Sequence, residues 1–321
     1  MYCFDSKRQY LQYLENHSCK KIMLLSDTNV HTLYPRILDG LHKSVFSYIL
    51  PAGEASKSFE NAQAILAMLL QNGFTRGDVL VSFGGGMVGD IGGFCASLYM
   101  RGIEHVILPT TIISMADSAI GGKTAINFLD VKNSIGSFYE ASRVFANVDF
   151  LNSLPQEEVQ SGWGELLKII LLCGNTQNFD LQACVAQAVE YKQALVQQDP
   201  LDKGQRHLLN LGHSIGHVVE LYYHLPHGIA VAVGLDYMAK VSDALQVSNG
   251  LQSKVRNLLA MCHLPNAENY PVNKKALQKL YADKKVQSTG QIKMVLLEDI
   301  GRASIHSLPV EEVIQLCLNN W

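Results

Sequence analysis

Short apolar runs recur through the first half of the chain, and segments with helical spacing separate them. In order, the runs are KKIMLLSD, SVFSYIL, DVLVSFGGG, EHVILPTT and SRVFANVDF. Between the second and third runs, from Ser58 to Gln71, apolar residues recur as on one face of a helix, at Ile65, Leu66, Leu69 and Leu70. Strands that alternate with helices are typical of a mostly parallel sheet wrapped by helices. The pattern therefore predicts a Rossmann-like α/β domain.

The pattern changes after Leu154-Pro155. From Gln156 to about Met261 the chain is rich in Gln, Ala, Leu, Glu and Val at helical spacing, and only IKMVLL and RASIHSL near the C-terminus have strand-like composition. A chain of 321 residues also exceeds what one hydrophobic core usually supports. We predict two domains, an α/β domain over residues 1–152 and a mainly helical domain over residues 153–321.

The composition is that of an ordinary globular protein and narrows the function classes. A net charge of −3, without a run of Lys or Arg, disfavours nucleic-acid binding. The N-terminus, MYCFDSKRQY, carries charges where a secretory signal needs apolar residues, and no stretch of 18 apolar residues occurs. The seven cysteines are scattered without a CxxC pair, so we expect reduced thiols in a cytoplasmic protein that neither crosses nor binds a membrane.

A glycine-rich turn, GGGMVGD from Gly84 to Asp90, follows a predicted strand and precedes a helical pattern. Glycines there let backbone N–H groups approach a pyrophosphate, although a tight turn that only packs a helix on the sheet explains the pattern equally well. The acidic ribose partner of a Rossmann dehydrogenase is not clearly placed, because Glu104 precedes a strand. Asp27, Glu54 and Lys57 follow other strands and could either contact a ligand there or serve as helix caps and solvated charges.

A second glycine-containing segment, DSAIGGKT from Asp117 to Thr124, is followed by Lys132-Asn133. Lysine beside a pair of glycines suits a phosphate or a carboxylate. The segment lacks the first glycine of an ATP-binding P-loop, which disfavours ATP hydrolysis.

Three histidines and one glutamate in the second half suggest a metal site. His213 and His217 are four residues apart and share a face if the segment is helical, His227 follows, and Glu165 lies in an apolar helical pattern. Two histidines and a carboxylate leave an open position on zinc, as a catalytic site requires. Any one of these histidines could instead be a hydrogen-bonded core residue. Spacing alone pairs His213 with His217 and leaves the third ligand undecided.

Taken together, nine motifs resemble the 3-dehydroquinate synthase family, the sugar phosphate cyclases of the shikimate pathway. In chain order they are PAGEASKS, GGGMVGD, RGIEHVILPTT, DSAIGGKTAIN, VKNSIGSF, SGWGELLK, LNLGHSIGH, HGIAVAVG and DKK, from about Asp27 to Gly301. The resemblance implies an NAD-binding domain over residues 1–152, a metal- and substrate-binding domain over residues 153–321, and a homodimer.

The resemblance also implies a role for each matching residue. Glu165, His213 and His227 match ligands of zinc or cobalt, which moves His217 to a place near the substrate, in proton transfer. NAD contacts match at Asp27, Glu54, Lys57, Gly85, Gly86, Asp90, Thr110, Thr111, Lys132, Phe150 and Ser153. Substrate contacts match at Asp117, Lys123, Asn133, Lys168, Lys192, Arg206, Asn210 and one or both of Lys284 and Lys285, and Arg101 matches an arginine that reaches the substrate phosphate across a dimer interface.

The implied reaction converts 3-deoxy-D-arabino-heptulosonate 7-phosphate to 3-dehydroquinate and phosphate, through transient oxidation by NAD, phosphate elimination, re-reduction and aldol closure. Rivals are a cyclase of glucose 6-phosphate or sedoheptulose 7-phosphate, a metal-dependent alcohol or glycerol dehydrogenase, and a non-catalytic binding protein. Lys192, Arg206 and Asn210 favour an acid substrate, and the phosphate-binding segments disfavour the dehydrogenases.

Three positions depart from the family pattern. Ile229 stands where the family commonly has glutamate, which puts support of the metal ligands in question. The stretch from His217 to His227 is shorter than usual, which leaves His224 as an alternative third ligand. Asp202 replaces the glutamate of many members and reaches less far if it shares in proton transfer.

Overall fold

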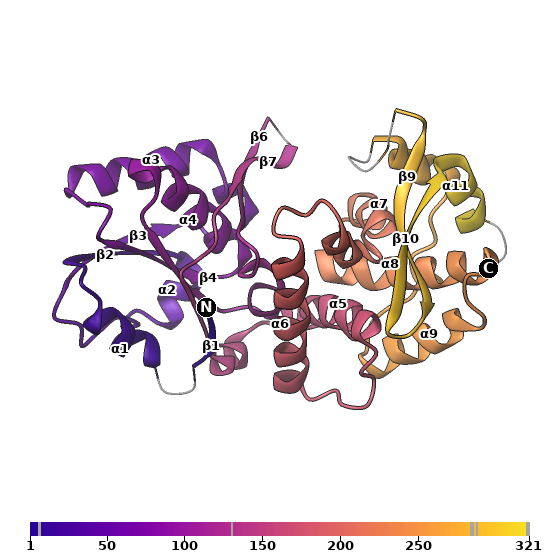
Figure 1. Cartoon of the computed structure of the whole chain (residues 1–321), viewed down its shortest axis with the longest axis horizontal. Coiled ribbons are helices and arrows are strands. Elements are labelled where there is room, and N and C mark those ends of the chain that lie inside the picture. Colours follow the sequence, from indigo (N-terminus) through magenta and orange to yellow (C-terminus); the bar gives the residue numbers. More distant parts are fainter. Residues whose placement is uncertain (6–7, 130, 283–285, 287, 319–321) are drawn as a thin grey trace. The chain divides into compact units, whose positions relative to one another are not determined.

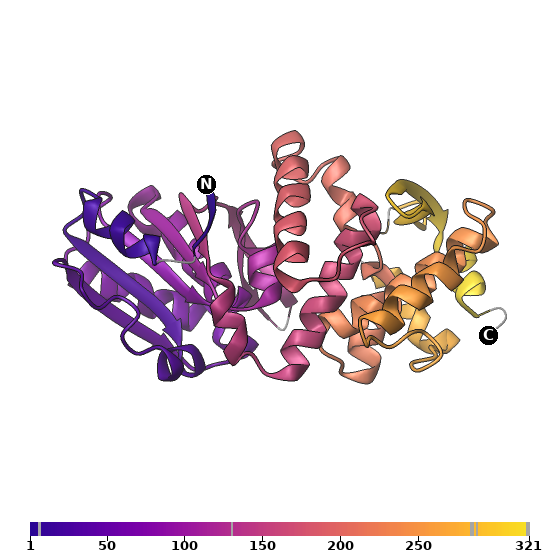
Figure 2. The same cartoon turned by 90° about the horizontal axis from the view of Figure 1, so that it is seen from below.

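The computed structural model describes residues 1–5, 8–129, 131–282, 286 and 288–318. The chain divides into two compact units, Met1–Leu154 and Pro155–Trp321. Figures 1 and 2 show the first unit in indigo to magenta and the second in rose to yellow. Among the described residues, no helix combines the length and the apolar character needed to span a membrane.

The first unit contains a six-stranded, fully parallel sheet in the order β1-β8-β5-β4-β2-β3. The strands are β1 (Tyr2–Phe4), β2 (Lys21–Asp27), β3 (Ser44–Leu50), β4 (Val79–Gly84), β5 (Glu104–Pro109) and β8 (Arg143–Ala146). The five predicted runs are therefore confirmed as strands. The three-residue β1 was not predicted, because so short a segment shows no periodicity. Strand β4 is buried along its whole length, as expected for a strand covered on both faces.

Helices cover both faces of this sheet, with α3 and α4 on one face and α1 and α2 on the other (Figure 1). They are α1 (Gln9–Asn16), α2 (Thr28–Leu33), α3 (Phe59–Gln71) and α4 (Gly86–Leu98). The predicted helix at Ser58 is confirmed as α3, and Ser58 is its N-cap, because its side chain accepts a hydrogen bond from the Asn61 N–H.

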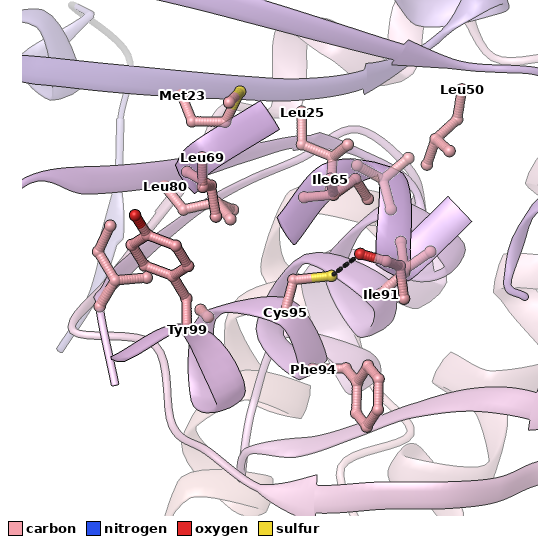
Figure 3. Close-up of a cluster of buried hydrophobic side chains, with 14 of the residues drawn as sticks. Met23, Leu25, Leu50, Ile65, Leu69, Leu80, Ile91, Phe94, Cys95 and Tyr99 are labelled. Carbon is pink, nitrogen blue, oxygen red and sulfur yellow. Dashed lines mark hydrogen bonds between the residues drawn. The ribbon is translucent and has the colours of Figure 1, made fainter. Parts of the chain in front are cut away.

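A core of apolar side chains fills the space between the sheet and the helices α3 and α4 (Figure 3). It joins Leu25 of β2 and Leu80 of β4 to Ile65 of α3 and Cys95 of α4. Helix α4 packs unusually close to the sheet: a Cβ added at Gly92 would lie 1.9 Å from the Ser82 hydroxyl oxygen. This close packing fixes where the N-terminus of α4 meets the end of β4.

A two-stranded antiparallel hairpin, β6 (Lys123–Phe128) and β7 (Val131–Phe138), also belongs to the first unit. Lys123 and Lys132 of this hairpin, with the glycine pair before it, are predicted to suit a phosphate or a carboxylate, but no strands are predicted there. The reason is physical, since β7 is mostly exposed and so lacks the apolar run that marks a buried strand.

The second unit is mainly helical, as predicted. Its helices are α5 (Gln156–Cys173), α6 (Leu181–Gln198), α7 (His213–Tyr223), α8 (His227–Ala244), α9 (Leu251–Met261), α10 (Lys274–Leu277) and α11 (Val310–Leu318). The two strand-like runs are confirmed as the antiparallel pair β9 (Gln291–Asp299) and β10 (Arg302–Pro309). Helix α8 is buried from Gly228 to Ser242 and packs against α5, α7 and α9. The N-terminus of this central helix carries His227.

Candidate active site

Three side chains from three helices of the second unit converge on one point. Glu165 comes from α5, His213 from the first residue of α7 and His227 from the first residue of α8. Glu165 Oε1 lies 3.5 Å from His213 Nε2 and 3.2 Å from His227 Nε2. One ligand atom of each residue lies within 4.8 Å of the others, so the three side chains can surround a single ion.

A glycine contact between α5 and α8 brings Glu165 and His227 together. A Cβ added at Gly164 would lie 1.9 Å from the carbonyl oxygen of Gly228, and one added at Gly228 would lie 1.7 Å from that of Ser161. Only residues without a side chain allow the two backbones to approach so closely. Glu165 and His227 are the direct chain neighbours of these glycines, and the contact therefore sets their separation.

A second glycine contact places His213. Gly212 has φ +77° and forms the N-cap of α7, a conformation that favours glycine. A Cβ added at Gly234 of α8 would lie 2.0 Å from the Gly212 carbonyl oxygen. Helix α7 therefore begins directly against α8, with His213 as its first residue.

Hydrogen bonds orient both imidazole rings. His213 Nδ1 lies 3.1 Å from the carbonyl oxygen of Leu211, and His227 Nδ1 lies 2.9 Å from Glu220 Oε2. Because each Nδ1 faces an acceptor, it carries the ring proton when the ring is neutral, and the lone pair of Nε2 then points toward Glu165. Metal-bound histidines usually have such a partner on the second ring nitrogen.

The arrangement fits a tetrahedral metal ion. Ligand atoms about 2.1 Å from such an ion lie about 3.4 Å from one another, close to the two separations from Glu165 Oε1. That oxygen is buried and accepts no well-aligned hydrogen bond from the described residues. Three ligands also leave a fourth position for a substrate oxygen. Residues of this type and geometry are therefore suited to zinc or a similar divalent ion.

Two other histidines of this region, His217 and His224, do not belong to the group around Glu165. The His217 ring centroid is 5.5 Å from that of His213 and 5.8 Å from that of His227. His217 forms a separate group with Glu220 and His227, and His224 belongs to neither group of the described residues. The pairing of His213 with His217 from spacing alone is therefore not the arrangement around Glu165.

Opposite charges stabilise the buried carboxylate. Burial opposes ionisation of Glu165, but Lys168 and the two histidines hold its pKa well below the ordinary value. Lys168 Nζ lies 2.6 Å from Glu165 Oε2, and both side chains are almost fully buried. Burial lowers the pKa of His213 to about 3. Burial opposes the charge on His227 as well, but Glu165 and Glu220 together raise its pKa to about 10.

In the first unit, the candidate nucleotide contacts gather where β4 ends. Gly85 is the N-cap of α4, and a Cβ added there would lie 3.2 Å from the Thr111 side chain. A Cβ at Gly84 would lie 3.3 Å from Asp27 Oδ2, while Asp27 Oδ1 caps α2. Asp27 therefore combines the cap role with a position beside the glycine turn. The Thr110 N–H donates to the Gly84 carbonyl oxygen over 3.0 Å and joins β5 to the turn.

The remaining candidates of this group lie on other helices, strands and loops of the first unit. Lys57 Nζ is 2.6 Å from Asp90 Oδ2 and 3.7 Å from Glu54 Oε1. Phe150 packs edge-on against Phe83 of β4, with ring centroids 5.3 Å apart. A short helix (Val148–Ser153) contains both Phe150 and Ser153, and the Ser153 hydroxyl accepts a hydrogen bond from Tyr34. Gly86 follows Gly85, and Lys132 lies on β7.

The candidate substrate contacts fall on both units. Lys123 and Asn133 lie on the hairpin, Asp117 lies in the short helix Ser114–Ser118, and Arg101 follows α4 with φ 65°. In the second unit, Lys168, Lys192 and Arg206 are buried, Asn210 ends the short helix Gln205–Asn210, and an Arg206 guanidinium nitrogen donates to the Pro200 carbonyl oxygen over 3.1 Å. Lys284 and Lys285 lie outside the described residues.

Two of the departures from the family pattern can be described. Ile229 is buried in the first turn of α8, and the carboxylate against His227 is instead Glu220. Glu220 was not predicted as part of the site, although it lies three residues after His217 and seven after His213, on the same face of α7. Asp202 Oδ1 lies 3.1 Å from His207 Nδ1, so this carboxylate has a histidine partner.

Comparison with protein families covers most of the chain. The model described as 3-dehydroquinate synthase N-terminal matches residues 47–161, and the one described as 3-dehydroquinate synthase C-terminal matches residues 162–286. The 3-dehydroquinate synthase of Xylella fastidiosa (strain 9a5c) is 36% identical over 93% of this chain and 83% of its own length. That of Pyrococcus abyssi is 36% identical over 92% of both chains.

Solved structures share the fold. A 2-deoxy-scyllo-inosose synthase, solved with carbaglucose-6-phosphate, NAD+ and Co2+, gives a TM-score of 0.88 at 21% identity and covers 100% of this chain and 96% of its own. The 2-epi-5-epi-valiolone synthase of Streptomyces hygroscopicus subsp. jinggangensis, solved with NAD+ and Zn2+, gives 0.84 at 24% identity, over 99% and 96%. A probable glycerol dehydrogenase of Sinorhizobium meliloti gives 0.66 at 14% identity, over 99% and 95%. The predicted fold class is thereby confirmed.

Proposed function

The chain belongs to the 3-dehydroquinate synthase family, and on that premise we propose that it converts 3-deoxy-D-arabino-heptulosonate 7-phosphate to 3-dehydroquinate and inorganic phosphate. The observation that carries the proposal is the convergence of Glu165, His213 and His227. A carbon–oxygen lyase of this kind needs an electrophile at a substrate hydroxyl, and the open fourth position provides room for one.

Two cofactors belong to the proposal. Glu165, His213 and His227 would hold zinc or cobalt, and the glycine turn with its surrounding polar residues would hold NAD. When bound, the two groups supply Lewis acidity at a substrate hydroxyl and a reversible hydride acceptor. Support comes from the donor set and its buried carboxylate oxygen, and from the two cyclases solved with NAD+ and Co2+ or Zn2+.

The chain's own residues would orient the site and move protons. Glu220 holds His227 through Nδ1, and Lys168 balances the carboxylate that faces both imidazoles. Both contacts keep the ligand atoms in place while the substrate exchanges. We assign His217 to proton transfer, since its ring lies beside both ligand rings without belonging to the group around Glu165.

Basic residues would bind the two anionic ends of the substrate. We assign the phosphate to Lys123, Asn133, Arg101 of a partner subunit and a lysine of the 284/285 pair. Arg206, with Lys192 and Asn210, would bind the carboxylate, because a planar guanidinium suits that group.

A homodimer and a cytoplasmic location complete the proposal. Leu98 and Met100 expose apolar side chains beside Arg101, and Met100 and Arg101 both have left-handed backbone conformations, at φ 47° and 65°. Such a strained, apolar corner supports a subunit contact. All seven cysteines are free, in keeping with a reducing compartment. Light scattering of the purified protein checks the dimer.

The decisive experiment mixes the purified protein with the heptulosonate phosphate, NAD and zinc, and follows inorganic phosphate and dehydroquinate. Both products should form in equal amounts without net accumulation of NADH. Accumulating NADH would instead identify an alcohol or glycerol dehydrogenase. Parallel assays with glucose 6-phosphate and sedoheptulose 7-phosphate test the other cyclases, and turnover of either in place of the heptulosonate phosphate would overturn the proposal.

A further inference from the structure

One asparagine on the hairpin bonds to two other segments of the first unit. The Asn127 backbone N–H donates to the Lys57 carbonyl oxygen over 2.8 Å, and its side-chain Nδ2 donates to Glu54 Oε1 over 2.9 Å. Its Oδ1 accepts from the Asn133 N–H over 2.9 Å. A single residue therefore uses its main chain and both ends of its amide to join three places in the chain.

An irregularity in the hairpin makes the first of these bonds available. The pairing of β6 with β7 shifts in register between Ile126 and Phe128, so Asn127 stands at a bulge. The N–H of a bulged residue does not form one of the hydrogen bonds between the two strands and can point away from them. The N–H of Asn127 points instead to the loop after β3.

That loop is already ordered by charge. Lys57, which is buried, lies between Asp90 of α4 and Glu54, at 2.6 and 3.7 Å. The bond from Asn127 reaches Glu54 Oε1, the same oxygen that faces Lys57. A series of contacts therefore runs from Asp90 of α4 through Lys57 to Glu54, and Asn127 connects Glu54 to the hairpin.

On the other side, Asn127 supports an unusual backbone. Asn133 has φ 53°, in the left-handed region, which asparagine tolerates better than most residues but which still costs free energy. Its N–H is held by Asn127 Oδ1. This hydrogen bond ties the backbone of β7 at Asn133 to β6.

We propose that Asn127 is a positioning residue that couples the dinucleotide-binding loop at Glu54 and Lys57 to the substrate-binding strand β7 at Asn133. This inference rests on the proposed function, which assigns those two segments to NAD and to the substrate phosphate. The side-chain amide of Asn127 donates to Glu54 and accepts from Asn133 at once. An aspartate retains the acceptor, loses the donor and adds a like charge opposite Glu54.

Two substitutions separate the role of the bond to Glu54 from that of the bond to Asn133. Asn127→Asp should weaken NAD binding, measured by titration calorimetry without substrate, about three- to tenfold, because the bond to Glu54 is lost. Its KM for the heptulosonate phosphate at saturating NAD should stay within about twofold of native, since the acceptor for Asn133 remains. Asn127→Ala should impair both quantities. Ser134→Ala, in the same hairpin, removes a hydroxyl that makes a long 3.4 Å contact with the Phe128 carbonyl oxygen; it serves as the matched control and should change neither the NAD affinity nor the KM.

A compensating change excludes a merely structural effect. Glu54→Gln lets the side chain at position 54 donate to the carboxylate introduced by Asn127→Asp. The double variant should therefore bind NAD as well as Glu54→Gln alone. If the losses in NAD affinity of Asn127→Asp and Glu54→Gln multiply in the double variant instead, the inference is wrong. It is also wrong if Asn127→Asp binds NAD like the native protein.

NAD binding and turnover by the native protein distinguish a failure of this inference from a failure of the proposed function. If it binds NAD but does not turn over the heptulosonate phosphate, the proposed reaction fails while the calorimetric comparison still decides the coupling to the NAD loop. If it does not bind NAD at all, both the proposed function and this inference are overturned.

Discussion

Two buried titratable side chains, one in each unit, have opposite surroundings. In the first unit, His105 of β5 lies beneath α4 beside the neutral Ser82 hydroxyl, which is 2.8 Å from His105 Nε2, and burial lowers the pKa of His105 to about 3. In the second, Glu165 stays ionised because Lys168 and two histidines surround it. A neutral pair can complete a core. A charged cluster holds its members ready for a ligand, and each member depends on the others.

The largest effect should come from removing a ligand of the charged cluster. His213→Ala deletes one of the three converging atoms, so turnover should fall below detection and the metal content of the purified protein should fall with it. Phosphate release and elemental analysis measure the two quantities. His263→Ala, at an exposed histidine of the same unit, is the control. Normal turnover by His213→Ala would refute the ligand assignment.

Breaking the charge balance should cost stability next. Lys168→Met leaves Glu165 buried without its closest cation and should lower the free energy of unfolding by about 3 kcal/mol in the presence of a chelator. Zinc should reduce this loss, because a bound cation also balances the carboxylate. Urea unfolding with and without zinc measures both, with the exposed Lys203→Met as control. An equal loss in both conditions would show that Lys168 acts only by packing.

The buried, neutral His105 should contribute to the pH dependence of the free energy of unfolding. His105 has a pKa of about 3 in the fold against an ordinary value of 6.5, so between these values the unfolded chain binds a proton that the fold does not. Its contribution to stability is complete above pH 6.5 and shrinks as pH falls, by about 2 kcal/mol at pH 5. His105→Gln should remove this part of the pH dependence, measured by urea unfolding at pH 7.5 and 5. An unchanged slope would mean that His105 is protonated in the fold.

The smallest effect should come from the support of one ligand. Glu220→Gln keeps the shape of the side chain but weakens the bond to His227 Nδ1, and should lower zinc affinity about tenfold. Competition with a chromogenic chelator measures the affinity, and the exposed Glu190→Gln provides the comparison. Equal affinities in the two variants would place Glu220 outside the metal site.

The sequence predicted the elements whose environment is regular. Buried parallel strands such as β2 and β4 produce continuous apolar runs, and α3 shows its apolar face and its N-cap directly. The β6–β7 hairpin was missed because exposure removes that signal. Hydrophobic periodicity therefore indicates burial, and it does not indicate a strand such as β7, which is mostly exposed.

The candidate site was predictable only in part, for a different reason. Spacing within α7 identifies His213 and His217, but nothing local connects them to Glu165 or His227 on other helices. The resemblance to known motifs provided that link. Glu220 and Asn127 escaped notice because their roles arise from contacts with His227 and Glu54, which only the folded chain brings within reach.

The contact between Gly164 and Gly228 has a consequence for the order in which the protein assembles. Helices α6 and α7 lie between these two glycines in the chain, so the carboxylate and the imidazole beside them meet only after α5 and α8 have docked. On the proposed ligand assignment, binding of a metal ion by Glu165, His213 and His227 therefore requires the docking of α5 against α8.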